Sequence, residues 1–290
     1  MATLRDIKRR IKGVQSTQQI TKAMKMVAAA RLRKAQEGIV NARPYARKIS
    51  LMLSHLITDT DLASNPYLSQ REVKNVCLVV VTADRGLCGA FNTNIIKEAA
   101  RYVQQNEDEG NIQIQLYCVG KKGFDYFSKR NFKLLGSKLN IFAHPTTETA
   151  VELTNELIQL FFNGTVDKIV LVYNEFKSII QQKIIFEDFL PIPLSDESKT
   201  KNEAHYILEH DQQSIFNFLL PRYIRAQMWR VFLESYASEL GARMTAMDNA
   251  TTNAKELIRS LNIKYNKERQ ASITKEIIEI VSGANALRSN

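Results

Sequence analysis

The sequence predicts a long antiparallel two-helix coiled coil formed by both termini, with a small doubly wound α/β domain of the Rossmann-like kind inserted between the helices. Three observations carry this prediction. Apolar residues recur at alternating spacings of three and four over both ends of the chain. Glycine and proline are rare in those two stretches. The middle instead alternates short apolar runs with amphipathic segments, which is typical of alternating strands and helices.

The amino-terminal part, residues 1–57, is predicted to form one coiled-coil helix. Thirteen of sixteen positions in a continuous heptad frame are apolar, and a frame of that length indicates a coiled-coil seam. Pro44 interrupts this stretch; because its ring removes a backbone donor and clashes with the preceding turn, we predict a bend or a break near Arg43. The frame comprises Leu4, Ile7, Ile11, Val14, Gln18, Thr21, Lys25, Ala28, Leu32, Ala35, Ile39, Ala42, Ala46, Ile49, Leu53 and Leu56.

The seam becomes polar at one level, at Gln18, Thr21 and Lys25. Over the same stretch a different face of the helix becomes apolar, through Ile20, Met24 and Val27. Two interpretations stay open. The change is either a stutter in the register or the level at which the helix stops facing its coiled-coil mate and meets another partner.

The carboxyl-terminal part, residues 209–290, is predicted to form the second coiled-coil helix. Its apolar residues keep the same spacing from Leu233 to Tyr265, and the frame then fails over Glu268 and Ser272 and resumes shifted. A helix gains most of its stability by burying its apolar face in tertiary contacts.

Neither terminal helix can bury so long a stripe alone, so we predict that the two pair with each other, antiparallel. Both frames fail, over residues 18–25 and 265–275. We expect these two stretches to lie close together.

Residues 70–194 are predicted to form the α/β domain, and a polar linker at residues 195–208 leads back to the second helix. The first strand reads V-C-L-V-V-V-T, an apolar run typical of a strand that is buried on both faces. The predicted strands are residues 76–82, 112–119, 168–173 and 183–190, and the predicted helices are residues 93–104, 121–130 and 147–162.

The loop after the first strand, A-D-R-G-L-C-G-A-F-N, is the place where such a fold would bind a phosphate at a helix amino terminus. Its Gly86-x-x-Gly89 spacing lacks the longer glycine signatures of nucleotide sites, which favours a simple strand-to-helix turn. Cys88, beside Arg85, is either a thiol of lowered pKa or a packing residue. The four histidines show no metal-ligand spacing. We therefore predict no catalytic, cofactor-binding or metal-binding residue.

The positive charge lies at the amino end. Residues 1–50 hold thirteen lysines and arginines and two acidic residues, a net charge of +11, whereas the whole chain carries +10. This segment is either a solvated basic face or a surface for an acidic partner, with nucleic acid, anionic lipid and acidic protein loops as the candidates.

Other features bound the setting of the protein. No apolar run approaches the length of about 18 residues that a membrane span needs, and the amino terminus has neither a signal-peptide core nor a transit segment. Three cysteines without a Cys-x-x-Cys pair suggest neither a disulfide framework nor a zinc site. We expect a protein that stays in a reducing compartment.

Four motifs in sequence order resemble the gamma subunit of F-type ATP synthases, and together they span almost the whole chain. The first two are Q-I-T-K-A-M-K-M-V-A-A-A-R-L-R-K-A-Q from Gln19 and T-A-D-R-G-L-C-G-A-F-N from Thr82. The others are E-L-G-A-R-M-T-A-M-D-N-A-T-T-N-A from Glu239 and R-Q-A-S-I-T-K-E-I-I-E-I-V-S-G-A-N-A-L from Arg269. The absence of a transit segment makes the chain look similar to the bacterial members.

The resemblance implies a central rotary shaft without catalytic residues or cofactors of its own. The expected partners are the alpha and beta subunits, which form a hexamer around the shaft, together with the epsilon subunit and the membrane-embedded c-ring. No nucleic-acid partner is implied. Attachment to the membrane is expected to be indirect, through the c-ring, at the cytoplasmic side of a bacterial cell membrane.

The resemblance also implies residues of contact. Those facing the moving loops of the beta subunits are Lys8, Arg9, Thr21, Lys22, Met24, Arg269, Gln270, Thr274 and Glu276. Those at the tip, which would turn in an apolar sleeve of the hexamer, are Gly283, Ala284 and Leu287. A nucleic-acid-binding coiled coil and a nucleotide-dependent α/β enzyme remain as alternatives.

Overall fold

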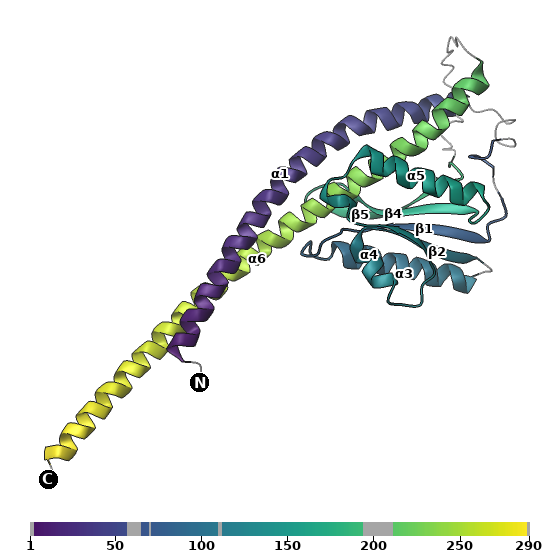
Figure 1. Ribbon diagram of the computed structural model, residues 1–290. Coiled ribbons are helices and arrows are strands. Elements are labelled where there is room, and N and C mark those ends of the chain that lie inside the picture. The colour runs from purple at the N-terminus through teal and green to yellow at the C-terminus, as the bar shows by residue number, and fades with distance from the viewer. Residues whose placement is uncertain (1–2, 57–64, 70, 110–111, 194–210, 289–290) are drawn as a thin grey trace. The chain divides into compact units, whose positions relative to one another are not determined.

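The computed structural model describes residues 3–56, 65–69, 71–109, 112–193 and 211–288 (Figure 1). The chain divides into two compact units. The larger comprises residues 28–243, and the smaller joins residues 1–27 to residues 244–290. The predicted linker at residues 195–208 lies outside the described residues.

Both predicted terminal helices are present. Helix α1 spans Leu4–Leu56 and helix α6 spans Gln212–Arg288. Helix α1 continues through Pro44, so of the predicted bend or break near Arg43 the break does not occur. A proline costs one backbone hydrogen bond and some local strain, but the seam residues on either side of it stay packed, with Ala46 only 4% exposed.

The heptad frame of α1 is the buried face of that helix in the larger unit. Leu32, Ala35 and Ile39 pack against α6. Their partners there are Leu233, Ala237 and Leu240, spaced by the same three and four residues. The residue numbers rise along one helix as they fall along the other, so the pair is antiparallel, as predicted.

Between the helices lies a five-stranded sheet in the order β3-β2-β1-β4-β5. Strands β1 to β4 are parallel, and β5 runs antiparallel to β4 along one edge. The bounds are β1 Asn75–Val81, β2 Gln113–Val119, β3 Leu134–Lys138, β4 Lys168–Phe176 and β5 Gln182–Leu190. The intervening helices are α3 Phe91–Glu109, α4 Lys121–Phe127 and α5 Thr147–Phe162, with a short 3-10 turn at Ile141–Ala143.

The doubly wound arrangement is confirmed, because helices cover both faces of the sheet (Figure 1). The strand that sequence reasoning missed is β3. It reads L-L-G-S-K, and all of its residues are half-buried, so it shows neither a continuous apolar run nor an alternation. Its amide groups extend the edge of β2.

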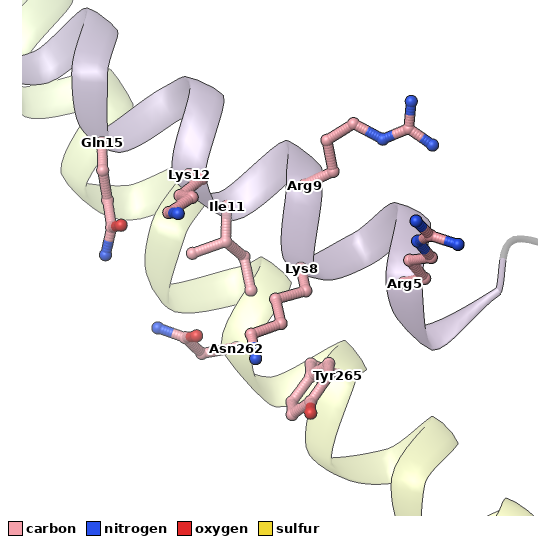
Figure 2. A pocket seen from close by; sticks show the side chains of 8 residues that line it. All are labelled: Arg5, Lys8, Arg9, Ile11, Lys12, Gln15, Asn262 and Tyr265. Carbon is pink, nitrogen blue, oxygen red and sulfur yellow. The ribbon is translucent and has the colours of Figure 1, made fainter.

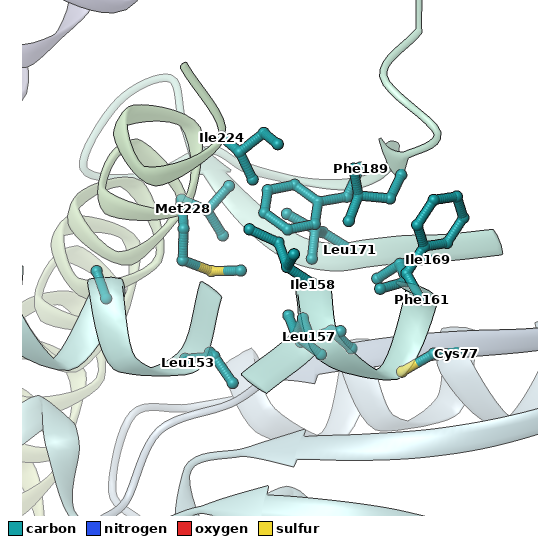
Figure 3. Packing of buried hydrophobic residues seen from close by; sticks show 14 of the residues in the cluster. Cys77, Leu153, Leu157, Ile158, Phe161, Ile169, Leu171, Phe189, Ile224 and Met228 are labelled. Carbon is teal, nitrogen blue, oxygen red and sulfur yellow. The ribbon is translucent and has the colours of Figure 1, made fainter. Parts of the chain in front are cut away.

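The two faces have separate cores. Strands β1 and β2 pack one set of side chains against α3 and α4, including Leu78, Ile95 and Phe127. On the other face, side chains of β1, β4 and β5 pack against α5 and also against α6, through Ile224 and Met228 (Figure 3). The terminal helix is therefore part of the core of the α/β domain. The division of the chain at residues 57, 70, 194 and 209 into separate domains stays a prediction.

An ion pair between a buried carboxylate and a half-exposed guanidinium also holds the helix pair to the sheet. The carboxylate of Glu234 on α6, 2% exposed, accepts hydrogen bonds from Arg43 Nη2 at 2.7 Å and Arg43 Nε at 3.0 Å. Its other oxygen accepts the backbone N–H of Phe176, at the end of β4, at 3.0 Å. One side chain thus joins α1, α6 and the central sheet.

A second pair connects α6 to the antiparallel edge of the sheet. Arg230 Nη2 lies 2.6 Å and 2.7 Å from the two carboxylate oxygens of Glu187 on β5. The hydroxyl of Tyr173 donates to Glu187 at 2.7 Å, and Arg230 Nη1 donates to that hydroxyl at 2.9 Å. Burial raises the pKa of Tyr173, and the neighbouring carboxylate of Glu187 adds to the shift.

We predict that Glu234→Ala lowers the free energy of unfolding by about 1 to 3 kcal/mol, because it leaves the part-buried N–H of Phe176 without its acceptor and removes the carboxylate that pairs with Arg43. Urea unfolding of the full chain measures the change. Glu37→Ala is the control. It removes the exposed pair with Arg33, at 3.6 Å, and is expected to cost less than about 0.5 kcal/mol. Equal losses for the two variants would contradict the assignment.

Candidate functional site

In the smaller unit, α1 and α6 also run antiparallel, and two polar pairs define their register. The hydroxyls of Thr21 and Thr251 lie 2.8 Å apart. One turn along, Lys25 Nζ lies 2.6 Å from Asp248 Oδ1. Residues near 21 on α1 therefore face residues near 251 on α6.

This register resolves the polar interruption of the seam. Thr21 is 8% exposed and Lys25 is half-buried, both at their heptad positions. The frame therefore contains no stutter, and α1 does not turn away from its mate here, so those two expectations were wrong; contact with another partner at this level stays a prediction. Polar pairs replace apolar ones across an unbroken seam. The second apolar face is real, however, because Ile20 is 59% and Val27 is 54% exposed.

The hydroxyls of Thr21 and Thr251 compete for hydrogen bonds with each other and with carbonyls of their own helices. Thr21 Oγ1 also lies 3.1 Å from the carbonyl oxygen of Gln18, and Thr251 Oγ1 lies 2.7 Å from that of Met247. The two hydroxyls carry two hydrogens and have three acceptor positions between them. Two of the three hydrogen bonds form at any moment, so the pair specifies register without locking a single arrangement.

The expectation that residues 18–25 and 265–275 lie close together was wrong. Across from the beginning of α1 lie Asn262 and Tyr265 (Figure 2). Beyond this level α1 has not begun, so the frame of α6 fails because its partner ends. Residues 269–284 are exposed apart from the half-buried Ser272.

A basic groove marks the start of α1. It has a volume of about 530 Å³ and is lined by Arg5, Lys8, Arg9, Ile11, Lys12, Gln15, Asn262 and Tyr265. In Figure 2 the side chain of Lys8 reaches across to Asn262 and Tyr265, whereas that of Arg9 points away from α6. Four cations and no carboxylate line the groove, so it presents a positive surface to an acidic group.

Asp6 lies on the same turn but is already engaged. Its carboxylate accepts hydrogen bonds from Thr3 and lies 3.0 Å from Arg9 Nη2. These hydrogen bonds from Thr3, and the charge of Arg9, lower the pKa of Asp6. The carboxylate caps the beginning of α1, which is the favoured place for a negative charge at a helix amino terminus.

The predicted contact residues fall into separate groups along the helices. On α1, Lys8, Arg9 and Lys22 are exposed, Met24 is half-buried, and Thr21 is buried in the seam. On α6 the exposed members are Arg269, Gln270, Thr274 and Glu276. The structure brings the α6 group onto two successive turns, with Thr274 Oγ1 donating to the carbonyl of Gln270 at 2.9 Å.

The tip residues continue this helix. Gly283 and Ala284 are exposed. Leu287 belongs to α6, but its side chain lies outside the described part of the structure. No described helix is long and apolar enough to cross a membrane.

The loop at Gly86 is bonded to α6. Arg243 of α6 donates from Nη1 to the carbonyl of Gly86 at 2.6 Å. The guanidinium also pairs with Glu239, a buried carboxylate. In an open α/β sheet, ligands bind beyond the carboxyl ends of the strands where the strand order reverses. Here that position, between β1 and β4, is filled by the protein's own helix.

Side chains of this loop and of the helix that follows it also form hydrogen bonds with backbone groups of the domain. The carboxylate of Asp84 accepts the backbone N–H groups of Lys121 at 3.0 Å, Asn140 at 2.8 Å and Phe142 at 2.9 Å. Asn92 Oδ1 accepts the N–H of Ala83 at 2.9 Å. The motif A-D-R-G-L-C-G-A-F-N therefore forms a loop that connects the sheet to α6. This supports the interpretation of the motif as a strand-to-helix turn.

Burial raises the pKa of a carboxyl group on α6 and of three thiols in the α/β domain. Burial raises the pKa of Glu239, while Arg243 opposes the shift. Burial also raises the pKa of the Cys88 thiol, so the alternative of a lowered pKa was wrong. Cys77 and Cys118 are free and buried, and burial raises the pKa of each to about 12. Among the described residues, no group of three or more His, Cys, Asp or Glu side chains is placed to hold a metal.

Sequence reasoning missed the side chains that fasten α6 to the α/β domain. One signal was available: Glu239 and Arg243 are charged, lie four residues apart, and stand within the apolar spacing of the seam. Glu234 gave no such signal, because its partners lie on α1 and at the end of β4.

Fold and site together define a class of protein: a long antiparallel helix pair with an inserted doubly wound α/β domain, whose usual ligand edge is closed by one of the helices. A family model described as ATP synthase matches residues 3–287. The ATP synthase gamma chain of Chloroherpeton thalassium is 48% identical over 303 residues, covering 100% of both chains. That of Prosthecochloris aestuarii is 50% identical over 291 residues, covering 99% of both. The chain belongs to the family of ATP synthase gamma chains.

Solved structures show the same fold. A chain of the Tetrahymena thermophila mitochondrial ATP synthase, described as central stalk and c-ring, has 28% identity and a TM-score of 0.61, covering 80% of this chain and 99% of its own. A chain of the Euglena gracilis mitochondrial ATP synthase has 22% identity and a TM-score of 0.69, covering 99% and 95%.

We predict that Thr21→Val and Thr251→Val each lower the free energy of unfolding by about 1 kcal/mol, whereas the double variant costs no more than either single one. Removing one hydroxyl places a methyl group against the other, which then bonds only to a carbonyl of its own helix, and removing both leaves an apolar seam. Urea unfolding followed by circular dichroism measures the cycle. Thr274→Val is the control, because Thr274 is exposed and bonds to its own helix. Strict additivity would contradict the pairing.

Proposed function

We propose that this chain is the rotary central shaft of an ATP synthase and has no catalytic residues of its own. The observation that carries the proposal is the continuity of α6. This single helix of 77 residues begins at Gln212, enters the core of the α/β domain at Phe216, and extends to the exposed stretch beyond Tyr265. A helix anchored in this way can transmit torque from one end to the other.

The relatives supply the setting of the proposal. Ion flow through the c-ring turns the α/β domain, with the epsilon subunit bound to it, and the helix pair turns inside the hexamer of alpha and beta subunits. Nucleotide chemistry belongs to the beta subunits. A rotor changes the state of such a subunit only by contacting its open and closed forms unequally. The protein then lies at the cytoplasmic side of a bacterial membrane, attached through the c-ring.

Exposed charge supports the proposed contacts with acidic loops of the beta subunits. Lys8 and Arg9 line a groove that has no acidic side chain, and Lys22 and Arg269 are exposed. Exposed cations near an acidic surface steer and orient contacts more than they hold them, which suits a contact that must form and break at every step. Gln270, Thr274, Glu276 and Met24 complete this set, and Thr21 acts from within the seam by fixing the level at which α1 and α6 meet.

Exposed apolar side chains support the proposed bearing at the tip. Ile273, Ile277 and Ile280 of α6 are 48%, 55% and 71% exposed. Large apolar side chains grouped on one exposed helix mark a surface that a partner covers. An apolar sleeve around Gly283, Ala284 and Leu287 would cover this surface without directional bonds, and the small residues limit interlocking.

The test is ATP hydrolysis by purified alpha and beta subunits from the same organism, with and without this chain, after size-exclusion chromatography. We expect co-elution and a large gain in turnover, and no hydrolysis by the chain alone. A chain that elutes alone and leaves the rate unchanged would refute the proposal and favour the nucleic-acid alternative, whose binding should weaken steeply with salt.

Charge reversal locates the contacts within that complex. Lys22→Glu and Arg269→Glu are each expected to lower the stimulated rate about ten-fold, equal to about 1.4 kcal/mol of activation free energy. Lys255→Glu, an exposed cation on α6 outside the proposed contacts, is the matched control and should leave the rate unchanged. Equal effects at all three positions would show that general charge, not contact, governs the rate.

The alternative of a nucleotide-dependent enzyme has its own test. A ligand that binds the folded state raises its melting temperature. Because Arg243 fills the edge where a nucleotide would bind, we expect Mg-ATP to leave the melting temperature of the isolated full chain unchanged. A saturable rise that disappears in Gly86→Pro would instead place a nucleotide at this loop.

A further inference from the structure

A second groove lies in the larger unit and is lined by none of the contact residues discussed above. It has a volume of about 560 Å³ and lies between α1, α6 and the first turns of α5. Its floor is apolar and includes Ala42, Ala226 and Trp229, and its rim carries Arg222 and Arg225. No acidic side chain lines it.

We propose that this groove is a docking site for an acidic amphipathic helix of a partner protein. The proposal is independent of the shaft function, because the groove uses none of the residues proposed to face the beta subunits. Three features of the groove decide the kind of partner: its charge, the partly engaged arginines that line it, and the size of the side chains on its floor.

The charge of the walls selects an acidic partner. Lys34 lies one turn before Gly38 on α1 and is exposed. The two arginines of α6 line the groove itself. The groove also begins at Thr147, the first residue of α5, where a helix amino terminus favours negative charge.

The arginines are only partly engaged by the chain itself. Arg225 Nη2 donates to Asn155 Oδ1 at 3.2 Å, but its Nε is buried and has no hydrogen-bond partner. The guanidinium of Arg222 lies 3.9 Å from the ring centre of Phe218, which is itself 57% exposed. A partner's carboxylate can form charge-assisted hydrogen bonds with the guanidinium groups of these two groove-lining arginines.

The floor is suited to a helix rather than to bulky loops. Gly38, Ala42 and Ala226 are small, so the backbone of a third helix can approach α1 and α6 closely. An amphipathic helix offers apolar side chains at spacings of three and four for the floor and acidic ones beside them for the rim. Tyr45, 55% exposed, and the half-buried Trp229 provide amphipathic contact area of the kind enriched at interfaces.

Trp229 is the only tryptophan in the sequence, so its fluorescence reports on this groove alone. The probe is a capped 14-residue peptide in which leucines at helical spacing alternate with glutamates, titrated into the full chain. We expect a saturable change in Trp229 emission that weakens as the ionic strength rises toward about 0.15 M. The same peptide with lysine in place of glutamate, and a scrambled acidic peptide, should give no saturable change.

Charge-reversal variants test whether the arginines of the groove select an acidic partner. Arg222→Glu with Arg225→Glu should weaken binding at least about ten-fold. Lys129→Glu with Lys133→Glu, which reverses two exposed cations elsewhere in the same unit, is the matched control and should leave it unchanged.

Asn41 allows a test that does not endanger folding. It lines the groove, is exposed, and is replaced by better helix formers in both variants. Asn41→Glu should weaken binding of the acidic peptide and Asn41→Lys should strengthen it. Three results would overturn the proposal: no change in Trp229 emission, binding indifferent to all these substitutions, or an emission change that depends on chain concentration alone, which would make a second copy of the chain the occupant.

Discussion

The structure depends on one constraint: two long helices carry apolar stripes that neither can bury alone. Burial of apolar surface is the main favourable term in folding, and an isolated helix gains little of it. The stripes of α1 and α6 are buried against each other in both units, through Leu32 and Leu240 in one and around Thr21 and Thr251 in the other. The α/β domain is folded onto this pair, because its second core is incomplete without Ile224 and Met228 of α6.

Apolar packing alone would leave the helices free to slide, and buried polar groups remove that freedom. Glu234 needs both Arg43 and the N–H of Phe176, and Arg243 needs the carbonyl of Gly86. A shift of one residue along either helix would break these bonds and leave buried charges unpaired, at a cost that apolar side chains do not impose. Thr21 and Lys25 serve the same end in the smaller unit. The polar groups contribute register, and the apolar groups contribute most of the stability.

How far the sequence could predict this structure follows from the range of each interaction. Periodicity is local, so the helix limits, α5 at Thr147–Phe162 and the buried strand β1 were predicted within a few residues. Strand β3 was missed because its half-buried residues carry no periodic signal. The meeting of residues 18–25 with 265–275 was predicted wrongly because a failing frame indicates only that a partner is unsuitable or absent. The register depends on pairs more than 200 residues apart in sequence, such as Lys25 with Asp248, and local patterns do not specify those.

The end of α6 that extends beyond the start of α1 carries an exposed apolar stripe. Inside the chain, an apolar residue at a seam position has a partner, as Leu261 does at 7% exposed. Beyond the start of α1, Ile273, Ile277 and Ile280 keep helical spacing and stay exposed. Each side chain displayed to water in this stripe forgoes about 1.5 to 3 kcal/mol of burial. This cost supports the proposal that the complement of the stripe lies on other subunits of the assembly.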